Sequence, residues 1–361
     1  MGYFSGTGLF GHIRDTSVCN VNIVCSILAG EANSFGSIVG INEWPTVSNC
    51  TSEEMIIAPY STCDSIGGIG GDGGDYFNCY TSGVIFSMIS NYLGGNSTYS
   101  GYFGGIAGSA EGIDSCYSDT DLIVVSTLSH MKEGEDRIYG ITSNTGGVAG
   151  MATGITNCYN SGNIAFILGT SIWDDTLKWG EQNERIGVGG VSGFVTNCSN
   201  CGNNGMVGAY EDLPSWASDI LKVDTIYSDR FERIQPNYEY YPNVFVGGIS
   251  GWCRENISLC YSGQTVHTDI ETGYVGGITG ASGYSNDSVS VTNCVYRNID
   301  NSMSAVGYQS SRAFTDQIKG VSDDELNDVT NYENWDFDFT WMTDDNLNKG
   351  LPMLQALTEY Y

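Results

Sequence analysis

Aromatic rings and carboxylates gather in two stretches of the sequence, residues 168–187 and 208–244. This combination suits a carbohydrate, because flat amphipathic rings offer contact surface to a sugar and paired acids can cleave a glycosidic bond. The candidate binding residues are Trp173, Asp174, Asp175, Trp179, Trp216, Tyr238, Tyr240 and Tyr241. The alternative is structural: a long segment needs a local core, so the same tryptophans would fold it onto the body of the protein.

Catalysis has weaker support in the sequence. Further acids lie in the same stretches, but the chain has 42 acids and clusters of them arise without function. These further acids are Glu181, Glu184, Glu211, Asp212 and Asp219. The three histidines are scattered, and the sequence has neither a His-Glu-x-x-His motif nor a Gly-x-Ser-x-Gly motif. We therefore assign no catalytic residue. The sequence favours a protein that is not an enzyme, and an enzyme stays the alternative.

Two motifs that bind metals in other proteins occur in incomplete form. Cys198-Ser199-Asn200-Cys201 is a single C-x-x-C pair, whereas a zinc site normally needs two such pairs or added histidines. Residues 67–75 match most of a calcium-binding nonapeptide, but Gly74 replaces its apolar residue and tandem copies are lacking. We predict no metal site and no cofactor, with Ca²⁺ at residues 67–75 as the alternative.

A repeat runs through the whole chain and must position these side chains. Its first half, Gly-Gly-[Ile/Val]-x-Gly, begins at residues 67, 104, 146, 189, 247 and 276, with weaker copies near 8 and 36. A cysteine follows each copy, at the same interval in three consecutive units: 67 to 79, 104 to 116 and 146 to 158. We assign to this cysteine ladder Cys79, Cys116, Cys158, Cys198, Cys260 and Cys294, with Cys19 and Cys50 in the two looser units.

Each unit consists of short β-prone runs separated by glycine and asparagine, and one unit alone cannot bury its apolar face. Stacking the units pairs strand on strand, which predicts an all-β protein, a right-handed parallel β-solenoid of about eight turns. The ladder cysteines would point inward as small buried hydrophobic residues. Four cysteines outside the ladder are the better candidates for disulfides: Cys25, Cys63, Cys201 and Cys253.

The predicted solenoid occupies residues 1–300, with insertions at 87–102, 126–145, 168–187 and 208–244 that protrude from one face. A short helix is expected at 214–222, with Leu213, Ala217 and Leu221 on one side. Residues 301–361 would form a cap, because an exposed strand edge invites further pairing. The residues expected to plug the open end are Trp335, Phe337, Phe339, Trp341, Leu351, Met353 and Leu354.

Net charge narrows the choice of partners. The sequence has 42 acidic and 13 basic residues, which gives a formal net charge of −29. Such a surface repels nucleic acid and anionic membranes. No apolar run is long enough to span a bilayer, and the first residues lack the basic start and apolar core of a secretory signal. We expect no nucleic-acid partner, no membrane span, and a chain that is a piece of a longer polypeptide.

The Gly-Gly-[Ile/Val]-x-Gly stretch followed by Asn-Cys-Tyr resembles the GLUG repeat, and the resemblance covers nearly the whole chain from Gly8 to Leu354. GLUG repeats occur in bacterial surface and secreted proteins, including adhesin-like proteins, and in non-catalytic parts of some peptidases that cleave immunoglobulin A. The resemblance implies a β-solenoid at the cell surface or outside the cell. It does not imply an activity, because one fold hosts many functions.

Two classes of function compete. The first is a non-catalytic secreted or cell-surface module that serves adhesion or binding, or acts as a stalk. Its partner would be a glycan, a host or cell-surface protein, or another copy of the chain. The second is a carbohydrate-active enzyme, a polysaccharide lyase or glycosidase built on a β-helix. The resemblance adds a third, the accessory region of a larger secreted peptidase. We favour the first, since no catalytic constellation stands at repeat-fixed positions.

Overall fold

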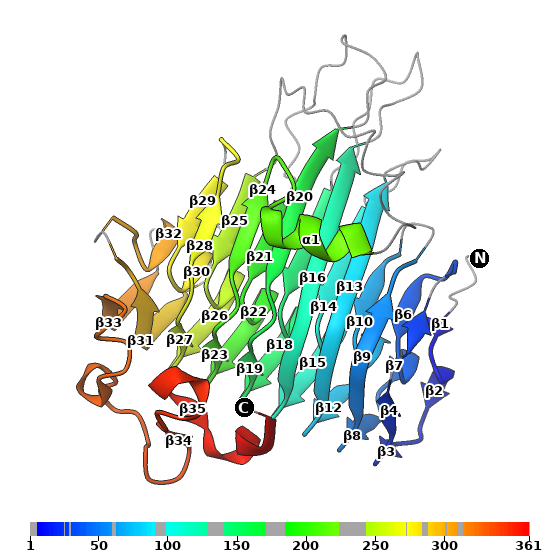
Figure 1. The fold of residues 1–361 in the computed structure, drawn as a ribbon, viewed down its shortest axis with the longest axis horizontal. Coiled ribbons are helices and arrows are strands. Elements are labelled where there is room, and N and C mark those ends of the chain that lie inside the picture. Colours follow the sequence, from blue (N-terminus) through cyan, green and yellow to red (C-terminus); the bar gives the residue numbers. More distant parts are fainter. Residues whose placement is uncertain are drawn as a thin grey trace.

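The computed structural model shows a parallel β-solenoid whose turns follow one another along the long axis of the molecule (Figure 1). It describes residues 6–24, 26–28, 30–59, 63–90, 99–128, 141–170, 185–223, 243–271, 273–283, 288–299, 302–309 and 313–360. Strands of neighbouring turns pair in parallel within two sheets of 8 and 25 strands. The predicted all-β parallel solenoid is confirmed.

The smaller sheet receives one strand from each turn. Most of these strands end at the first glycine of the repeat, so that Gly67, Gly104 and Gly146 stand opposite one another in successive turns. In order along the solenoid the strands are β1 (Gly6–Thr7), β6 (Ser34–Gly36), β10 (Ser65–Gly67), β14 (Tyr99–Gly104), β17 (Ile141–Gly146), β21 (Arg185–Gly189), β25 (Asn243–Gly247) and β29 (Gly273–Gly276).

The larger sheet forms the rest of each turn. Its first run of strands leaves the glycine corner: β2 (Phe10–Arg14), β3 (Val18–Cys19), β7 (Val39–Glu43), β8 (Thr46–Ser48), β11 (Gly70–Asp72), β12 (Asp75–Phe77), β15 (Ala107–Asp114), β18 (Ala149–Thr156), β22 (Ser192–Ser199), β26 (Ser250–Ser258), β30 (Thr279–Ser282) and β32 (Val306–Gln309). Its second run follows the next corner: β4 (Asn22–Val24), β5 (Ile27–Leu28), β9 (Thr51–Ile57), β13 (Tyr80–Ser90), β16 (Tyr117–Leu128), β19 (Tyr159–Asn160), β20 (Ile164–Thr170), β23 (Gly202–Asn203), β24 (Val207–Tyr210), β27 (Tyr261–Ser262) and β28 (Val266–Thr268). Two strands span both runs, β31 (Ser290–Arg297) and β33 (Phe314–Val321).

Two apolar cores run along the inside of the solenoid, because like residues of successive turns lie in register. One core collects the ladder cysteines and the apolar residue of the glycine motif, which is Ile69, Ile106, Val148, Val191, Ile249 or Ile278. The other core lies between the smaller sheet and the second run, with Phe103, Leu122 and Phe166 among its members. The cores explain why a single unit of the repeat cannot fold alone.

The predicted insertions are shorter than the sequence suggested. Strands continue to residues 90, 128, 170 and 210 and resume at 99, 141, 185 and 243, so the predicted bounds fall inside strands. The predicted helix is confirmed as α1 (Ser215–Val223), in which Ala217 is buried against the outside of the second run. Figure 1 shows α1 lying across these strands.

The cysteine ladder has a different membership from the predicted one. Strand pairing sets Tyr159 opposite Gly202 and Gly202 opposite Tyr261, so the preceding residues Cys158, Cys201 and Cys260 share one position. Cys198 instead pairs with Ile155 and Ile257, and Cys19 pairs with Ser48 and is exposed. The ladder therefore consists of Cys50, Cys79, Cys116, Cys158, Cys201, Cys260 and Cys294, preceded by Val21 and followed by Ile318.

The reason lies in the corner before each ladder position. The residue that precedes a ladder cysteine has a positive φ, for example 51° at Asn157 and 51° at Asn200. Asparagine tolerates this left-handed conformation better than most residues. Because Asn200 makes the corner, the next residue, Cys201, enters the ladder. The assignment of Cys198 to the ladder was wrong.

Neither Cys201 nor Cys253 forms a disulfide, and the same holds for the other ladder cysteines. The expectation of disulfides at Cys201 and Cys253 is therefore not met, whereas a bridge that involves Cys25 stays a prediction, since Cys25 lies outside the described residues. Cys63 and Cys253 are buried like the ladder cysteines. Burial without a bridge fits the general behaviour of cysteine as a small apolar residue.

The C-terminal segment lies along the side of the solenoid and not across its end. The parallel pairing continues to Val321, so the solenoid extends one turn beyond the predicted boundary at residue 300. The remaining elements are η1 (Val329–Asn331), β34 (Trp341–Met342), η2 (Asn348–Gly350), β35 (Met353–Leu354) and η3 (Gln355–Tyr360). In Figure 1 they pass beneath the strands back toward β15. Their aromatic and aliphatic side chains pack on a row of tyrosines of the wall: Tyr80, Tyr117, Tyr159 and Tyr261.

One asparagine of this segment ties it to the tyrosine row. The hydroxyl of Tyr159 donates to Oδ1 of Asn348 (3.0 Å), and Nδ2 of Asn348 donates to the hydroxyl of Tyr261 (3.1 Å). The ring of Tyr360 stacks on Tyr80 with centroids 4.7 Å apart. The predicted plug is thus a strap, formed by residues 322–360, that lies over the side wall. Phe339, one of the predicted plug residues, is 83% exposed.

The strap gives a first testable prediction. Trp341 is fully buried and its ring lies 4.4 Å from that of Trp335. Replacing Trp341 with alanine is expected to lower the free energy of unfolding by about 3–5 kcal/mol, as for other buried tryptophans. Urea unfolding monitored by circular dichroism measures the loss. Phe339→Ala is the matched control and should cost less than about 0.5 kcal/mol because the ring is exposed; equal losses in the two variants would contradict the packing.

Candidate functional site

Most of the predicted binding residues lie outside the described residues. This holds for Trp173, Asp174, Asp175, Trp179, Tyr238, Tyr240 and Tyr241. Trp216 is described: it lies on α1, is half-buried, and packs with Leu213 and Ile220 against the outside of the second run. Trp216 therefore has the structural role given as the alternative to ligand binding: it packs its segment onto the body of the protein. Whether the other seven residues bind a ligand stays a prediction.

Among the described acids near α1, no three have carboxylate oxygens that all lie within 4.8 Å of one another. Asp212 and Asp219 are exposed, and the backbone amide of Glu211 donates to Oδ1 of Asp269 (2.7 Å). The Asp269 carboxylate therefore holds the start of the α1 segment against the neighbouring turn. Glu181 and Glu184 lie outside the described residues.

An open groove of about 610 Å³ crosses the wall formed by β12, β15, β18, β22 and β26. The side chains that face it lie on two parallel rows, since alternate residues of a strand point to the same side of a sheet. One row consists of Asp75, Gly112, Gly154, Asn197 and Asn256. The other row consists of Phe77, Asp114, Thr156, Ser199 and Ser258. No local pattern in the sequence predicts this groove.

Two glycines make the hollow of the groove. A Cβ atom at Gly154 would meet no other atom within 4 Å, so this position is open. At Gly112 a Cβ atom would lie 2.8 Å from Oδ1 of Asp75, so the exposed Asp75 carboxylate leans over the groove floor. The floor therefore leaves room for a ligand beside a carboxylate, which accepts hydrogen bonds.

The two ends of the groove differ in chemistry. At one end Nδ2 of Asn256 donates to Oδ1 of Asn197 (2.8 Å), and Nδ2 of Asn197 donates to Oε2 of Glu255 (3.2 Å). At the other end the ring of Phe77 is 46% exposed. Five strands at the usual spacing span about 19 Å, so the groove offers a ring, carboxylates and amides along an extended path.

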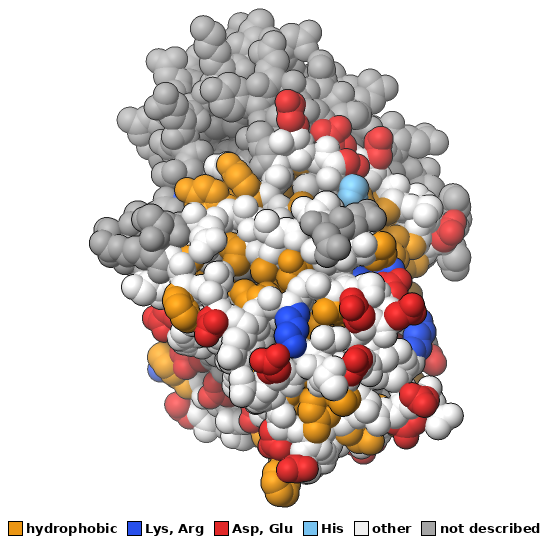
Figure 2. Space-filling view, turned by 90° about the vertical axis from the view of Figure 1, so that its left-hand side faces the viewer, with side chains coloured by type: hydrophobic (Ala, Val, Ile, Leu, Met, Phe, Trp, Pro, Cys, Tyr) orange, Lys and Arg blue, Asp and Glu red, His pale blue; other side chains and the backbone are white. Residues whose placement is uncertain are grey.

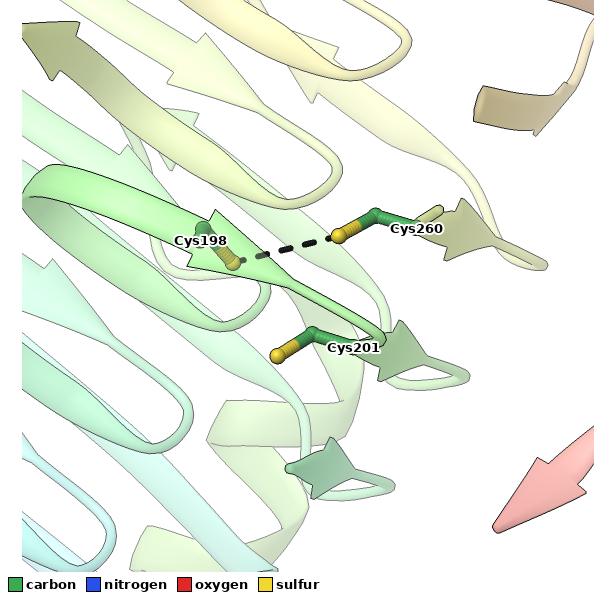
Figure 3. A group of neighbouring side chains, drawn as sticks. All are labelled: Cys198, Cys201 and Cys260. Carbon is green, nitrogen blue, oxygen red and sulfur yellow. Dashed lines mark hydrogen bonds between the residues drawn. The ribbon is translucent and has the colours of Figure 1, made fainter. Parts of the chain in front are cut away.

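A cluster of three thiols lies under one edge of this groove. The Sγ atoms of Cys198, Cys201 and Cys260 lie within 4.8 Å of one another, and those of Cys198 and Cys260 are 3.9 Å apart. Figure 3 shows the three side chains pointing toward one another from neighbouring turns. All three are buried, and Cys198 also lines the groove. Within the described ranges this is the group of side chains best placed to hold a metal ion.

The thiols of this cluster influence one another's ionisation. Burial alone would raise the pKa of Cys201, but hydrogen bonds from Cys158, Cys198 and Cys260 outweigh it and hold that pKa well below the usual value for a thiol. Burial, followed by its thiol neighbours, raises the pKa of Cys260. Cys201 is thus the thiol of the group that loses its proton most readily, since thiol neighbours stabilise its charged form.

The glycine-rich stretch at residues 67–75 serves the corner between β11 and β12. Gly73 and Gly74 have φ values of 83° and 74°, a conformation that glycine adopts readily. Oδ1 of Asp72 accepts a hydrogen bond from Oγ of Ser109 (2.5 Å). The stretch is therefore part of the solenoid repeat, and calcium binding by it stays the untested alternative.

Comparisons with protein-family models, curated proteins and solved structures found no match for this chain. The resemblance to GLUG repeats therefore stays a prediction from the sequence. No helix in the described part of the chain is long and apolar enough to cross a membrane.

Reactivity toward a thiol reagent separates Cys19 from the other described cysteines. Cys19 is exposed, whereas Cys50, Cys79, Cys116 and the rest are buried. A maleimide added to the reduced native protein is expected to label Cys19 within minutes and the buried thiols only after denaturant is added. Peptide mass spectrometry identifies the labelled sites. Fast native labelling of Cys116 would show that the ladder does not face the interior.

Proposed function

We propose that this chain is a non-catalytic binding module of a secreted or cell-surface repeat protein, and that it holds a glycan chain along the wall groove. The observation that supports this most is the groove itself, which crosses five successive strands and is lined by Asp75, Asp114, Asn197 and Asn256. Acids and amides are the side chains that take sugar hydroxyls, and the exposed ring of Phe77 offers a stacking surface. Because the solenoid repeats, a polymer with a regular repeat is the ligand that suits it.

Charge restricts the glycan to neutral or basic types. The formal net charge of the chain is −29. Figure 2, which faces the C-terminal end of the solenoid, shows many more acidic than basic side chains on that surface. An anionic polysaccharide would be repelled by this field. The same charge argues against a lyase, whose substrates are polyanionic sugars.

A glycan array run beside a polysaccharide-degradation screen tests the proposal. Gly154→Leu is the sharpest variant, since Gly154 lines the groove and a Cβ atom there meets no protein atom within 4 Å. It should abolish binding while leaving the unfolding midpoint near that of the wild type. Asp324→Asn, at an exposed acid of the strap, is the matched control and should bind as the wild type does.

Three outcomes would contradict this function. Turnover of a polysaccharide that is lost in Asp75→Asn would favour the carbohydrate-active enzyme. Glycan binding unchanged by Gly154→Leu would place the site elsewhere, with the insertions at 168–187 and 208–244 as the next candidates. An absence of glycan binding would favour a stalk or the accessory region of a larger secreted peptidase.

Self-association is a second candidate, and the last strand of the solenoid favours it. The first four residues of β33 are exposed, and Phe314 is 59% exposed. An uncovered strand edge offers backbone groups for pairing with another chain. Light scattering at increasing protein concentration should then show assembly that Phe314→Lys reduces. A monomer at every concentration would remove this candidate.

A further inference from the structure

Cys198 occupies a position that belongs to an aliphatic residue in the neighbouring turns. The residues paired with it are Ile155 and Ile257, and both are fully buried. Cys198 therefore places an additional thiol beside the ladder, opposite Cys201 and Cys260. This juxtaposition is what brings three sulfur atoms together at one point of the core.

The thiol of Cys198 differs from the ladder thiols in what it faces. Each ladder thiol donates to the carbonyl two residues before it, as Cys201 does to Ser199 (3.2 Å) and Cys260 does to Ser258 (3.2 Å). The sulfur of Cys198 instead contacts the sulfur of Cys260, at 3.9 Å. Cys198 thus points at the ladder and not at a backbone acceptor.

The spacing of the sulfur atoms fits a three-coordinate ion. A metal–sulfur bond of about 2.3 Å in a trigonal arrangement sets the sulfur atoms about 4.0 Å apart. The observed separation of Cys198 and Cys260 is 3.9 Å, and all three sulfurs lie within 4.8 Å of one another. Among the described histidines, cysteines and acids, the cluster holds cysteines alone. A purely sulfur set selects soft ions, of which Cu(I) readily accepts low coordination numbers.

We propose that Cys198, Cys201 and Cys260 bind one Cu(I) ion in a three-sulfur site inside the solenoid. Each thiol that binds as a thiolate exchanges its S–H bond for a Cu–S bond and releases one proton to water, and no electron is transferred. The cluster lies behind the groove: Cys198 comes from β22, one of the strands of the groove wall, and all three thiols are buried. A copper site here is independent of glycan binding, and it departs from the prediction of no metal site.

The burial of the site limits how many of the three thiols can bind as charged thiolates. A site with three thiolates and one Cu(I) would bury a net charge of −2, which is costly away from water. Retaining a proton on one of the three thiols lowers that charge to −1. Cys158 adds a fourth thiol beside Cys201 that can donate a hydrogen bond to the thiolate.

Titration of the reduced full chain with Cu(I) under anaerobic conditions, against a colorimetric Cu(I) chelator, tests the proposal. The wild type is expected to take up one ion per chain. Copper X-ray absorption should show sulfur neighbours at about 2.3 Å, the usual metal–thiolate distance. Cys198→Ile installs the residue of the neighbouring turns and so preserves packing. It should lower Cu(I) affinity by more than the roughly 10–100-fold that loss of a supporting residue costs at metal sites.

Cys50→Val is the matched control, because the next position along the ladder is already a valine, Val21. It should bind Cu(I) as the wild type does. Circular dichroism confirms that each variant is folded before its affinity is compared. Equal affinity of the wild type and Cys198→Ile would overturn the proposal, as would a folded wild type that takes up no ion. Tighter binding of Zn(II) than of Cu(I), or a disulfide within the cluster in anaerobically isolated protein, would also overturn it.

Discussion

Replacing Gly146 with alanine is expected to destabilise the solenoid by at least about 3 kcal/mol, the upper end of the usual cost of overpacking a core. A Cβ atom at Gly146 would overlap the carbonyl oxygen of Ala149 and the Cα atom of Ser192, and would lie 2.5 Å from the amide nitrogen of Gly193. These are all backbone atoms, which cannot rotate away as the end of a side chain can. The clash is therefore relieved only by opening the corner of the turn.

Gly154→Ala in the same turn is the control for this effect. A Cβ atom there meets nothing within 4 Å, and neither glycine has a positive φ. The two substitutions thus reduce the conformational freedom of the backbone equally. They differ only in the space available for the new Cβ atom. Urea unfolding should show a change within about 0.5 kcal/mol for Gly154→Ala. Similar losses in both variants would show that the glycine corner is not held by close backbone packing.

The glycine corner is also the feature that made the fold predictable. A run such as Gly-Gly-Val-Ala-Gly, repeated along the chain, requires close approach of backbones at one recurring place. At Gly104 and Gly189, as at Gly146, a Cβ atom would collide with the carbonyl oxygen of the residue three positions later in the chain. The spacing of these glycines therefore encodes where each turn bends, and stacking follows because one turn has no core of its own.

The cysteine ladder shows why one of its members, Cys201, was not predicted. The interval from first glycine to ladder cysteine in the preceding turns, 67 to 79, 104 to 116 and 146 to 158, recurs from 189 to 201 and not from 189 to 198. Keeping that interval would have placed Cys201 in the ladder. The choice of Cys198 followed the local Asn-Cys pair, whereas the corner is made by Asn200. A left-handed corner, and not residue identity alone, sets the register.

The groove and the strap depend on contacts that the repeat does not describe. The groove exists because Gly112 and Gly154 face outward where neighbouring turns have Asp75 and Asn197. Within any single strand, the polar residues that line the groove form only the ordinary alternation of polar and apolar residues. The strap was predicted from its aromatic residues, but its path was not, because the tyrosine row that it covers forms only when turns stack. Long-range packing of this kind leaves no local signal in the sequence.

Raising the pH above about 8.5, the ordinary pKa of a thiol, is expected to destabilise the protein steeply. Burial raises the pKa of the thiols of Cys158, Cys253 and Cys260 in the folded protein. In the unfolded chain these thiols ionise at their ordinary pKa, so above it the unfolded state binds fewer protons than the folded state. The free energy of unfolding then falls with pH. The stabilisation is fully present below the unfolded pKa and is lost as pH rises toward the folded values.

Each of these three thiols, whose pKa is raised in the folded protein, should contribute a loss of about 1.4 kcal/mol per pH unit above its unfolded pKa. Urea unfolding of the reduced protein between pH 7 and pH 10 measures the slope. Cys158→Val removes one of these groups in a ladder that already accepts Val21, so its slope should be shallower by one proton. Phe339→Ala, at an exposed ring that does not ionise, should leave the slope unchanged. A free energy of unfolding that stays constant up to pH 10 would mean that Cys158, Cys253 and Cys260 ionise as readily in the folded chain as in the unfolded one.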